Sequence, residues 1–331
     1  MSDLTIAVDA MGGDHAPAAP VDGAVAAART GLHITLVGRA PAVLAELARH
    51  EPAARQLISV VDAPDVIAMD ESPLAALRRK PRASIKVASD LVARREAHAV
   101  FTAGHTGAAL IAAHSALGVL PGAERPALAV TIPTRAGPSV LLDAGANMDC
   151  RPEHLVQFAV MGAAYARVAI GVERAEVGLL SIGTEAGKGN DLIREAHGRL
   201  AHAPIQFIGN LEARDIFTGR ARVIVCDGFT GNVALKVSEG LVEAIEAMLR
   251  EEFEAAGASR LGAKLIEPAF ERFKRRVDYA QYGGAPLLGV AGLVVVGHGH
   301  SSATAVANGI ITAAGLARKR VVERLVSSLA G

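Results

Sequence analysis

The 331-residue chain carries 34 basic residues (Lys and Arg) and 34 acidic residues (Asp and Glu), and 51% of its residues are hydrophobic. This length and composition suit one large domain with a sizeable core, and the zero net charge gives no reason to expect a nucleic-acid partner. Two cysteines, Cys150 and Cys226, are too few for a disulfide framework or a thiolate metal site. The longest apolar run, residues 287–296, is about half of a membrane-spanning helix, and the N-terminus lacks the pattern of a secretory signal. We therefore expect a cytoplasmic protein.

Short apolar, β-branched runs alternate with helical patterns along the chain. Strands are expected at residues 4–8, 33–37, 57–61, 97–101, 128–132, 140–142, 177–180, 205–208, 223–225 and 293–296. Helices are expected at residues 17–29, 41–49, 85–95, 107–117, 152–168, 192–200, 233–253 and 302–329. This alternation favours parallel pairing and a three-layer α/β/α sandwich with a mostly parallel sheet. We treat residues 1–331 as a single elaborated α/β domain, without a firm internal boundary.

Glycines cluster at four of the turns between an apolar run and a helical pattern. The clusters are residues 11–14, 187–190, 227–232 and 297–301. Glycine lets backbone N–H groups approach an anion closely, and a helix N-terminus adds partial positive charge. In an open parallel sheet such turns lie at one edge, where ligands bind. The clusters therefore predict an enzyme that handles a phosphate-bearing or anionic small molecule.

The standard phosphate and catalytic motifs do not fit these clusters. Residues 183–189 resemble a P-loop, but the loop is one residue short, and Gly189 stands where the magnesium-binding Ser or Thr belongs. The first strand leads to Met11-Gly12-Gly13-Asp14 and not to a G-x-G-x-x-G fingerprint. No H-E-x-x-H, C-x-x-C or G-x-S-x-G sequence occurs, so zincin and serine-hydrolase chemistries lack support.

Six longer motifs resemble one family together. They are IAVDAMGGDHAP at residues 6–17, TAGHTGA at 102–108, LDAGAN at 142–147, SIGTEAGKGN at 181–190, VCDGFTGN at 225–232 and YGGAPLLG at 282–289. In this order they resemble the bacterial phosphate acyltransferases of phospholipid synthesis. The resemblance implies a fold similar to phosphotransacetylases and to isocitrate and isopropylmalate dehydrogenases. Two departures are His105, where the family usually has Asn, and His300, where it usually has Ser.

The resemblance also implies an activity and partners. The expected reaction transfers a fatty acyl group from acyl carrier protein to inorganic phosphate, giving acyl phosphate by direct attack on the thioester, with no metal or redox cofactor. A homodimer is implied, with peripheral contact at the cytoplasmic face of the inner membrane and with the downstream glycerol-phosphate acyltransferase.

This chemistry needs an anion seat, a group that orients the nucleophile or moves its proton, and donors for developing negative charge. The residues assigned catalytic roles are Lys188, Asn232, Asp227 and His298. The residues assigned to phosphate or substrate binding are Asp9, Gly12, Gly13, Gly104, His105, Thr106, Asp143, Asn147, Gly189, Asn190, Lys236 and Ser301. Lys236 lies four residues after Asn232 and should share its helix face.

Structural roles compete with several of these assignments. The strand-end aspartates Asp9, Asp143 and Asp227 are equally typical of caps and turns, and Ser301 could simply cap the last helix. Cys226 is expected to be an unreactive residue of the core, because no neighbouring group in the sequence would lower the pKa of its thiol.

Residues 253–282 interrupt the strand and helix alternation with a basic amphipathic excursion. Its basic side chains are Arg260, Lys264, Arg272, Lys274, Arg275 and Arg276. Three binding partners for this excursion remain open: an acidic carrier protein, an anionic membrane, or the second subunit of a dimer.

Three other functions also remain open at this stage. A short-chain phosphotransacetylase would use acyl-coenzyme A, and acyl-chain length would distinguish it. A decarboxylating NAD-dependent dehydrogenase would need a divalent metal, for which the chain lacks an aspartate cluster. A non-catalytic lipid-precursor-binding or scaffolding protein would explain the basic excursion but not the glycine turns.

Overall fold

The computed structural model describes residues 4–255, 268–269, 272–273 and 283–329. The strands are β1 (Thr5–Asp9), β2 (His33–Gly38), β3 (Ile58–Asp62), β4 (Ala99–Thr102), β5 (Ala127–Thr134), β6 (Gly137–Leu142), β7 (Glu176–Leu180), β8 (Gln206–Leu211), β9 (Val223–Val225), β10 (Ala285–Leu288) and β11 (Val294–Val296). Within the described residues they form one eleven-stranded sheet in the order β3-β2-β1-β4-β11-β10-β5-β6-β9-β7-β8. The mostly parallel sheet expected from the sequence is confirmed.

The α-helices are α1 (Ala18–Ala28), α2 (Ala40–Leu47), α3 (Pro73–Arg79), α4 (Ser84–Ala93), α5 (Thr106–Leu117), α6 (Pro152–Ala169), α7 (Asp191–Leu200), α8 (Gly228–Ala255), α10 (Ala303–Arg318) and α11 (Val321–Leu329). The described connections also contain the short 3₁₀ helices η1 (Pro52–Arg55) and η2 (Ala213–Phe217).

The sheet consists of two parallel halves that run in opposite directions. One half is β3-β2-β1-β4-β11 and the other is β6-β9-β7-β8. Between them lie β10 and β5, each antiparallel to both of its neighbours. The paired residues that connect the halves are Val295 with Pro286, Leu287 with Leu128, and Ala129 with Leu142. Through this register the carboxyl ends of β11 and β6 come to nearly the same level in the middle of the sheet.

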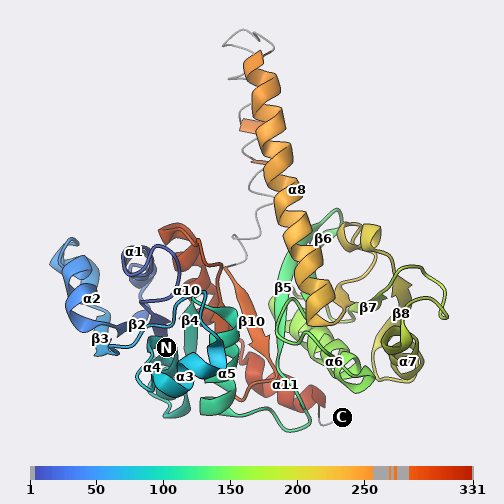
Figure 1. Ribbon diagram of the computed structural model, residues 1–331, viewed down its shortest axis with the longest axis horizontal. Coiled ribbons are helices and arrows are strands. Elements are labelled where there is room, and N and C mark those ends of the chain that lie inside the picture. The colour runs from blue at the N-terminus through green and yellow to red at the C-terminus, as the bar shows by residue number, and fades with distance from the viewer. Residues whose placement is uncertain (1–3, 256–267, 270–271, 274–282, 330–331) are drawn as a thin grey trace.

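Helices cover both faces of the sheet, as Figure 1 shows. Alternate strand residues face opposite sides, so Ile6 and Val8 enter one core and Ala7 enters the other. The first core packs against α1, α2, α6, α7, α10 and α11. The second packs mainly against α4 and α5. The three-layer arrangement is therefore confirmed.

All ten expected strands are found, with ends displaced by three residues at most. The sequence missed β10, because the apolar run at residues 287–296 hides a chain reversal at Gly289, which has a φ of +91°. It also missed the short helix α3. The expected closing helix at residues 302–329 is wrong as one element: it divides into α10 and α11 at Arg320, which has a φ of +53°. Helix α8 begins at Gly228, so the glycine cluster at residues 227–232 is largely its first turn and not a loop.

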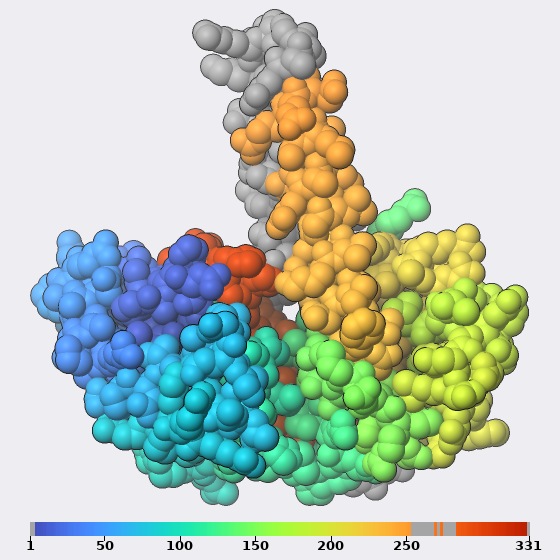
Figure 2. All heavy atoms as spheres, viewed as in Figure 1, coloured from blue at the N-terminus to red at the C-terminus, as the bar shows by residue number. Residues whose placement is uncertain are grey.

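Helix α8 is 28 residues long and stands out from the body of the molecule (Figures 1 and 2). Large apolar side chains on it are exposed at intervals of three or four residues, which places them along one side. We call Phe229, Val233, Val237, Leu241, Ile245 and Met248 the α8 apolar stripe. None of the helices in the described part of the chain is both long and apolar enough to cross a bilayer.

Two glycines of α10 offer a matched test of the packing between α10 and the sheet. A Cβ at Gly309 would overlap the ring of Phe101, which is 1% exposed in β4, whereas a Cβ at Gly315 would meet nothing within 4 Å. We expect Gly309→Ala to lower the free energy of unfolding by about 2 kcal/mol, because a closely packed core has no room for the methyl group.

Gly315→Ala is the control and should raise stability by about 0.5 to 1 kcal/mol, since alanine is the better helix former. Thermal unfolding followed by circular dichroism measures both. Equal effects at the two positions would contradict this account of the packing.

Candidate active site

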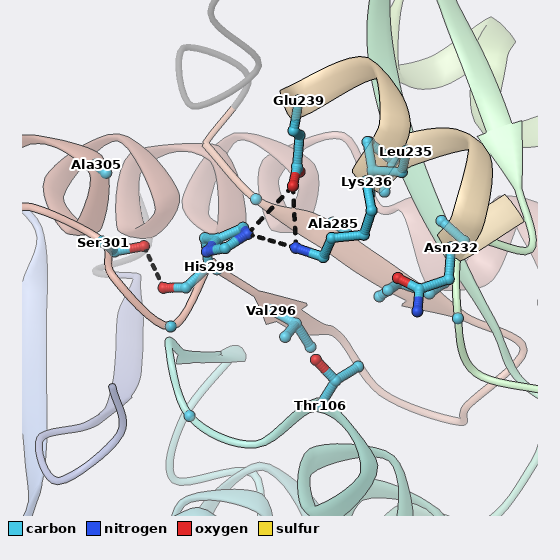
Figure 3. A pocket seen from close by; sticks show the side chains of 18 of the residues that line it. Thr106, Asn232, Leu235, Lys236, Glu239, Ala285, Val296, His298, Ser301 and Ala305 are labelled. Carbon is cyan, nitrogen blue, oxygen red and sulfur yellow. Dashed lines mark hydrogen bonds and ion pairs between the residues drawn. The ribbon is translucent and has the colours of Figure 1, made fainter. Parts of the chain in front are cut away.

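A cavity of about 320 Å³ lies where the carboxyl ends of the two half-sheets meet (Figure 3). The first half contributes the loops after β4 and β11, and the second contributes the loop after β6 and the first turns of α8. The polar or glycine residues of its wall include Gly104, Thr106, Thr131, Gly145, Asn232, Lys236, Glu239, Gly297, His298, Gly299 and Ser301. Apolar side chains complete it, among them Leu128, Val130, Leu235 and Val296.

Three ionisable side chains meet in this cavity. Lys236 Nζ lies 2.9 Å from His298 Nε2 and 3.0 Å from Glu239 Oε2, and Glu239 Oε2 lies 3.6 Å from His298 Nε2. An ammonium group only donates hydrogen bonds, so this geometry assigns His298 Nε2 as the acceptor of a neutral imidazole. Figure 3 shows that Lys236 and Glu239 reach down from α8 while His298 approaches from the loop after β11.

Glu239 was not singled out from the sequence. Burial of its side chain disfavours the charged form, but the Lys236 ammonium, which donates to Oε2, opposes burial, and the pKa of Glu239 lies below its usual range. The signal that could have found it is its spacing, because Asn232, Lys236 and Glu239 recur at intervals of four and three on one helix face. The predicted shared face of Asn232 and Lys236 is confirmed, since both line the cavity.

The loop that carries His298 is fixed to the loop after β1. The Asp14 amide donates to Gly299 O at 2.8 Å, and His300 Nδ1 lies 3.3 Å from Asp14 Oδ2. The rings of His298 and His300 are 4.1 Å apart between centroids. The glycine clusters at residues 11–14 and 297–301 therefore form one structure.

The loop after β1 also packs closely against the loop after β4, through Asp9, Gly12 and Gly13. Thr102 Oγ1 donates to Asp9 Oδ2 at 2.8 Å, and the Met11 amide donates to Asp9 Oδ1 at 3.1 Å. A Cβ at Gly12 would stand 2.7 Å from Gly104 N and 2.8 Å from Asp9 Oδ2, so only glycine lets these loops pack so closely. Gly13 has a φ of +98°. Burial raises the pKa of Asp9, and hydrogen bonds from Ser84 and Thr102 oppose that effect.

Asp143 organises the loop after β6. Its carboxylate accepts hydrogen bonds of 2.7 to 3.1 Å from the amides of Leu128, Gly145, Ala146 and Asn147 and from Asn147 Nδ2. Because every partner donates, the turn holds the carboxylate form, although burial raises the pKa of Asp143. Neither Asp143 nor Asn147 lines the cavity, and a substrate role for them stays a prediction.

Two further candidates serve as helix caps or loop ties. Asp227 accepts from the amide and from the hydroxyl of Thr230, each at 2.8 Å, at the start of α8. His105 Nδ1 accepts from the Gly107 amide at 3.1 Å and caps α5, whereas its neighbour Thr106 lines the cavity.

The expected cap of the last helical segment is wrong by one residue. Ser302 caps α10 by accepting from the Ala305 amide at 3.2 Å, while Ser301 Oγ donates to His298 O at 2.6 Å. The helix begins one residue later than the sequence pattern indicated, which leaves Ser301 in the wall of the cavity.

The cluster around Lys188 is placed apart from this cavity. Lys188, Gly189 and Asn190 lie between β7 and α7, and β7 is separated from β6 by β9. Lys188 is exposed, and Asn190 Oδ1 caps α7 by accepting from the Ile193 amide at 3.0 Å. None of the three lines the cavity, so the structure does not bring the fourth cluster to the other three. Their phosphate-binding roles stay predictions.

Neither cysteine has the environment of a reactive thiolate. Burial raises the pKa of Cys226 well above its ordinary value and raises the pKa of half-buried Cys150 to about 12. The expectation that Cys226 is inert core agrees with its complete burial.

Arg260, Lys264, Lys274, Arg275 and Arg276 lie outside the described residues, and Arg272 is described and exposed. Across the described ranges, no three or more His, Cys, Asp or Glu side chains are grouped as metal ligands.

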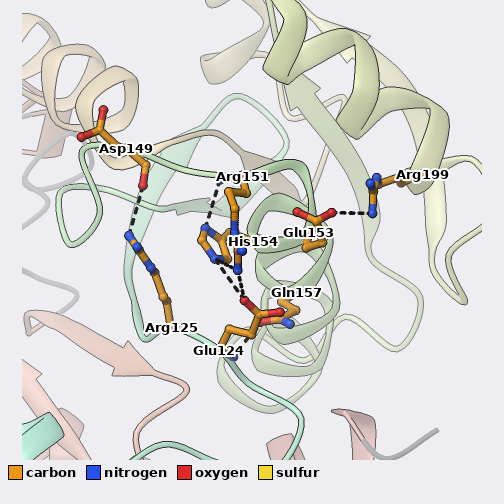
Figure 4. Close-up of polar contacts among 8 residues, drawn as sticks. All are labelled: Glu124, Arg125, Asp149, Arg151, Glu153, His154, Gln157 and Arg199. Atoms are coloured by element: carbon orange, nitrogen blue, oxygen red, sulfur yellow. Dashed lines mark hydrogen bonds and ion pairs between the residues drawn. The ribbon is translucent and has the colours of Figure 1, made fainter.

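A second polar cluster lies at the start of α6, away from the cavity (Figure 4). Glu124 pairs with Arg151 and lies 3.4 Å from Nε2 of buried His154, whose pKa is lowered by burial. The Arg151 amide donates to His154 Nδ1 at 3.0 Å, and Glu153 pairs with Arg199 of α7 at 2.7 Å. These contacts fix the start of α6 to its neighbours.

Comparison with known proteins identifies the family. A family model described as "Fatty acid synthesis protein" matches residues 4–324. A phosphate acyltransferase of Nitratidesulfovibrio vulgaris (strain DP4) is 49% identical over 331 residues, covering 99% of this chain and 96% of its own. The chain belongs to the phosphate acyltransferase family. A Geobacter sulfurreducens phosphate acyltransferase is 48% identical over 327 residues, covering 98% of this chain and 94% of its own. The chain is thus an enzyme of the transferase class, and the family resemblance of the six motifs is confirmed.

Solved structures with little sequence identity share the fold. A phosphotransacetylase from Streptococcus pyogenes superposes with a TM-score of 0.63 at 18% identity, covering 97% of this chain and 94% of its own. A 4-hydroxythreonine-4-phosphate dehydrogenase from Klebsiella pneumoniae superposes with a TM-score of 0.54 at 13% identity, covering 96% of this chain and 100% of its own. The predicted likeness to phosphotransacetylases is confirmed at the level of fold.

The hydrogen bonds to Asp143 provide a test of how the cavity wall is held. Asp143→Asn replaces one acceptor oxygen with a donor that faces N–H groups, and we expect it to lower the free energy of unfolding by about 3 kcal/mol. Thermal unfolding measures the change. Asp149→Asn, at an exposed position in the same loop, is the control and should change stability by less than about 0.5 kcal/mol. A harmless Asp143→Asn would show that the turn does not depend on the carboxylate.

Proposed function

We propose that this enzyme transfers a fatty acyl group from acyl carrier protein to inorganic phosphate, giving acyl phosphate and free carrier thiol. The observation that carries the proposal is the meeting of Lys236, His298 and Glu239 in a cavity with apolar walls between glycine-rich turns. A cation and a neutral imidazole suit a phosphate nucleophile, and the apolar walls suit an acyl chain.

The proposed reaction proceeds by direct attack. Lys236 and the Asn232 amide hold hydrogen phosphate, and a phosphate oxygen attacks the thioester carbonyl carbon. The new C–O bond forms as the C–S bond breaks. When Lys236 turns its ammonium from His298 Nε2 to the bound phosphate, the Nε2 lone pair is freed; it takes the proton of hydrogen phosphate and returns it to the departing thiolate, so the proton balance is closed. The raised pKa values of Cys150 and Cys226 support a route without an acyl-cysteine.

The test is an assay of the purified protein with long-chain acyl carrier protein and phosphate. We expect acyl phosphate and free carrier to form in equal amounts, and intact-protein mass spectrometry should find no acyl-enzyme. In the same assay, Lys236→Met should raise the Michaelis constant for phosphate by about 10-fold or more, because a charge-assisted contact is lost. The Michaelis constant for the carrier should change little.

Arg250→Met is the control for this variant, since it removes an exposed cation from the same helix at a distance from the cavity. Lys188→Ala, assayed in parallel, tests the phosphate contact predicted for Lys188. Turnover of short-chain acyl-coenzyme A in place of the acyl carrier would favour a phosphotransacetylase. A trapped thioester on either cysteine would overturn direct attack.

The proposed homodimer, and peripheral contact with a membrane and the downstream acyltransferase, would need exposed apolar surface. The α8 apolar stripe supports both the homodimer and the peripheral contact, because a continuous exposed apolar stripe is typical of an interaction surface. We expect Val237→Ser with Leu241→Ser to shift sedimentation equilibrium toward monomer or to reduce co-sedimentation with anionic liposomes. If both measurements match the unmodified protein, the stripe has neither role.

A further inference from the structure

Glu239 lies deepest among the three ionisable groups of the cavity. Its side chain is 10% exposed, whereas that of Lys236 is 54% exposed. Its Oε2 accepts a hydrogen bond from Lys236 and lies 3.6 Å from His298 Nε2, and its Oε1 is buried with no hydrogen-bond partner among the described residues. A buried carboxylate with one unpaired oxygen depends strongly on the cation at its other oxygen.

Lys236 needs an anchor because of its flexible four-carbon stem. A half-exposed lysine has many rotamers, and fixing them costs about 2 kcal/mol of side-chain entropy. Glu239 follows three residues later on α8, so its carboxylate holds the ammonium on the cavity side of the helix. Held there, Lys236 also reaches His298 Nε2.

We propose that Glu239 is a positioning residue, which acts through Lys236 by holding its ammonium group on the cavity side of α8, over the phosphate seat. This inference rests on the proposal that the cavity binds phosphate. The lowered pKa of Glu239 agrees with it, because the carboxylate stays ionised and able to pair with Lys236.

The proposal makes a prediction of definite sign. A carboxylate near a phosphate dianion repels it, so if Glu239 acted only as a local charge, Glu239→Gln would tighten phosphate binding. Positioning predicts the opposite: about 10-fold weaker phosphate binding, because Lys236 is no longer held in place. Isothermal titration of the intact protein with inorganic phosphate measures this without any turnover.

A double-mutant cycle with Lys236→Met separates positioning from a general structural effect. If Glu239 acts through Lys236, adding Glu239→Gln to Lys236→Met should weaken phosphate binding no further. Additive losses would overturn the proposal. Glu243→Gln is the matched control, an exposed glutamate one turn further along α8, and it should bind phosphate like the unmodified protein.

A spectroscopic readout needs no phosphate at all. The protein is labelled with ¹⁵N-lysine, and the resonance of the Lys236 ammonium group is identified by its loss in Lys236→Met. We expect this resonance to be visible, because the hydrogen bonds slow the exchange of the ammonium protons with water. It should broaden or vanish in Glu239→Gln, and also in Glu239→Ala, which removes the acceptor entirely. An unchanged Lys236 signal in both variants would overturn the positioning role. Absence of phosphate binding by the unmodified protein would overturn the proposed function, while the resonance still tests the role of Glu239.

Discussion

The site depends on the antiparallel pairing of β10 with β11 and of β5 with both β10 and β6. This pairing reverses the second half-sheet, so the carboxyl ends of both halves meet in the middle of the sheet. A wholly parallel sheet of eleven strands would spread its strand ends along one edge, at about 4.8 Å per strand. The reversal instead brings loops from opposite halves around one cavity, which helices and loops then close.

The polar residues around this cavity are of two kinds, those that fix the loops and those that line the cavity. Asp9, Asp143 and Asp227 accept hydrogen bonds within or next to their own loops and fix the backbone. The ionisable groups that reach the cavity instead come from α8 and from the loop after β11. Aspartates can give turns a rigid frame because they accept several N–H donors at once, whereas Lys236 and His298 pair with each other in the wall of the cavity.

Helix α8 connects the chemistry with the outer surface of the protein. Its first turns carry Asn232, Lys236 and Glu239 in the cavity wall, and the α8 apolar stripe begins on the same turns and continues outward. The two sets occupy different sides of one helix. Because an α-helix is held by its own backbone hydrogen bonds, a partner bound to the stripe would touch the element that sets the position of the cavity's cation.

The sequence by itself determined the ten main strands, the family, the layered fold class and the shared face of Asn232 and Lys236, because apolar runs, long motifs and helical spacing are local patterns. Only the tertiary structure decided which clusters meet. It brought residues 11–14 and 297–301 together, joined the latter to α8, and left Lys188 two strands beyond β6. It also revealed β10 and the place of Glu239 beside His298. The physical reason is that the two half-sheets are joined by pairing between residues more than 150 positions apart, such as Leu128 and Leu287, which no local periodicity encodes.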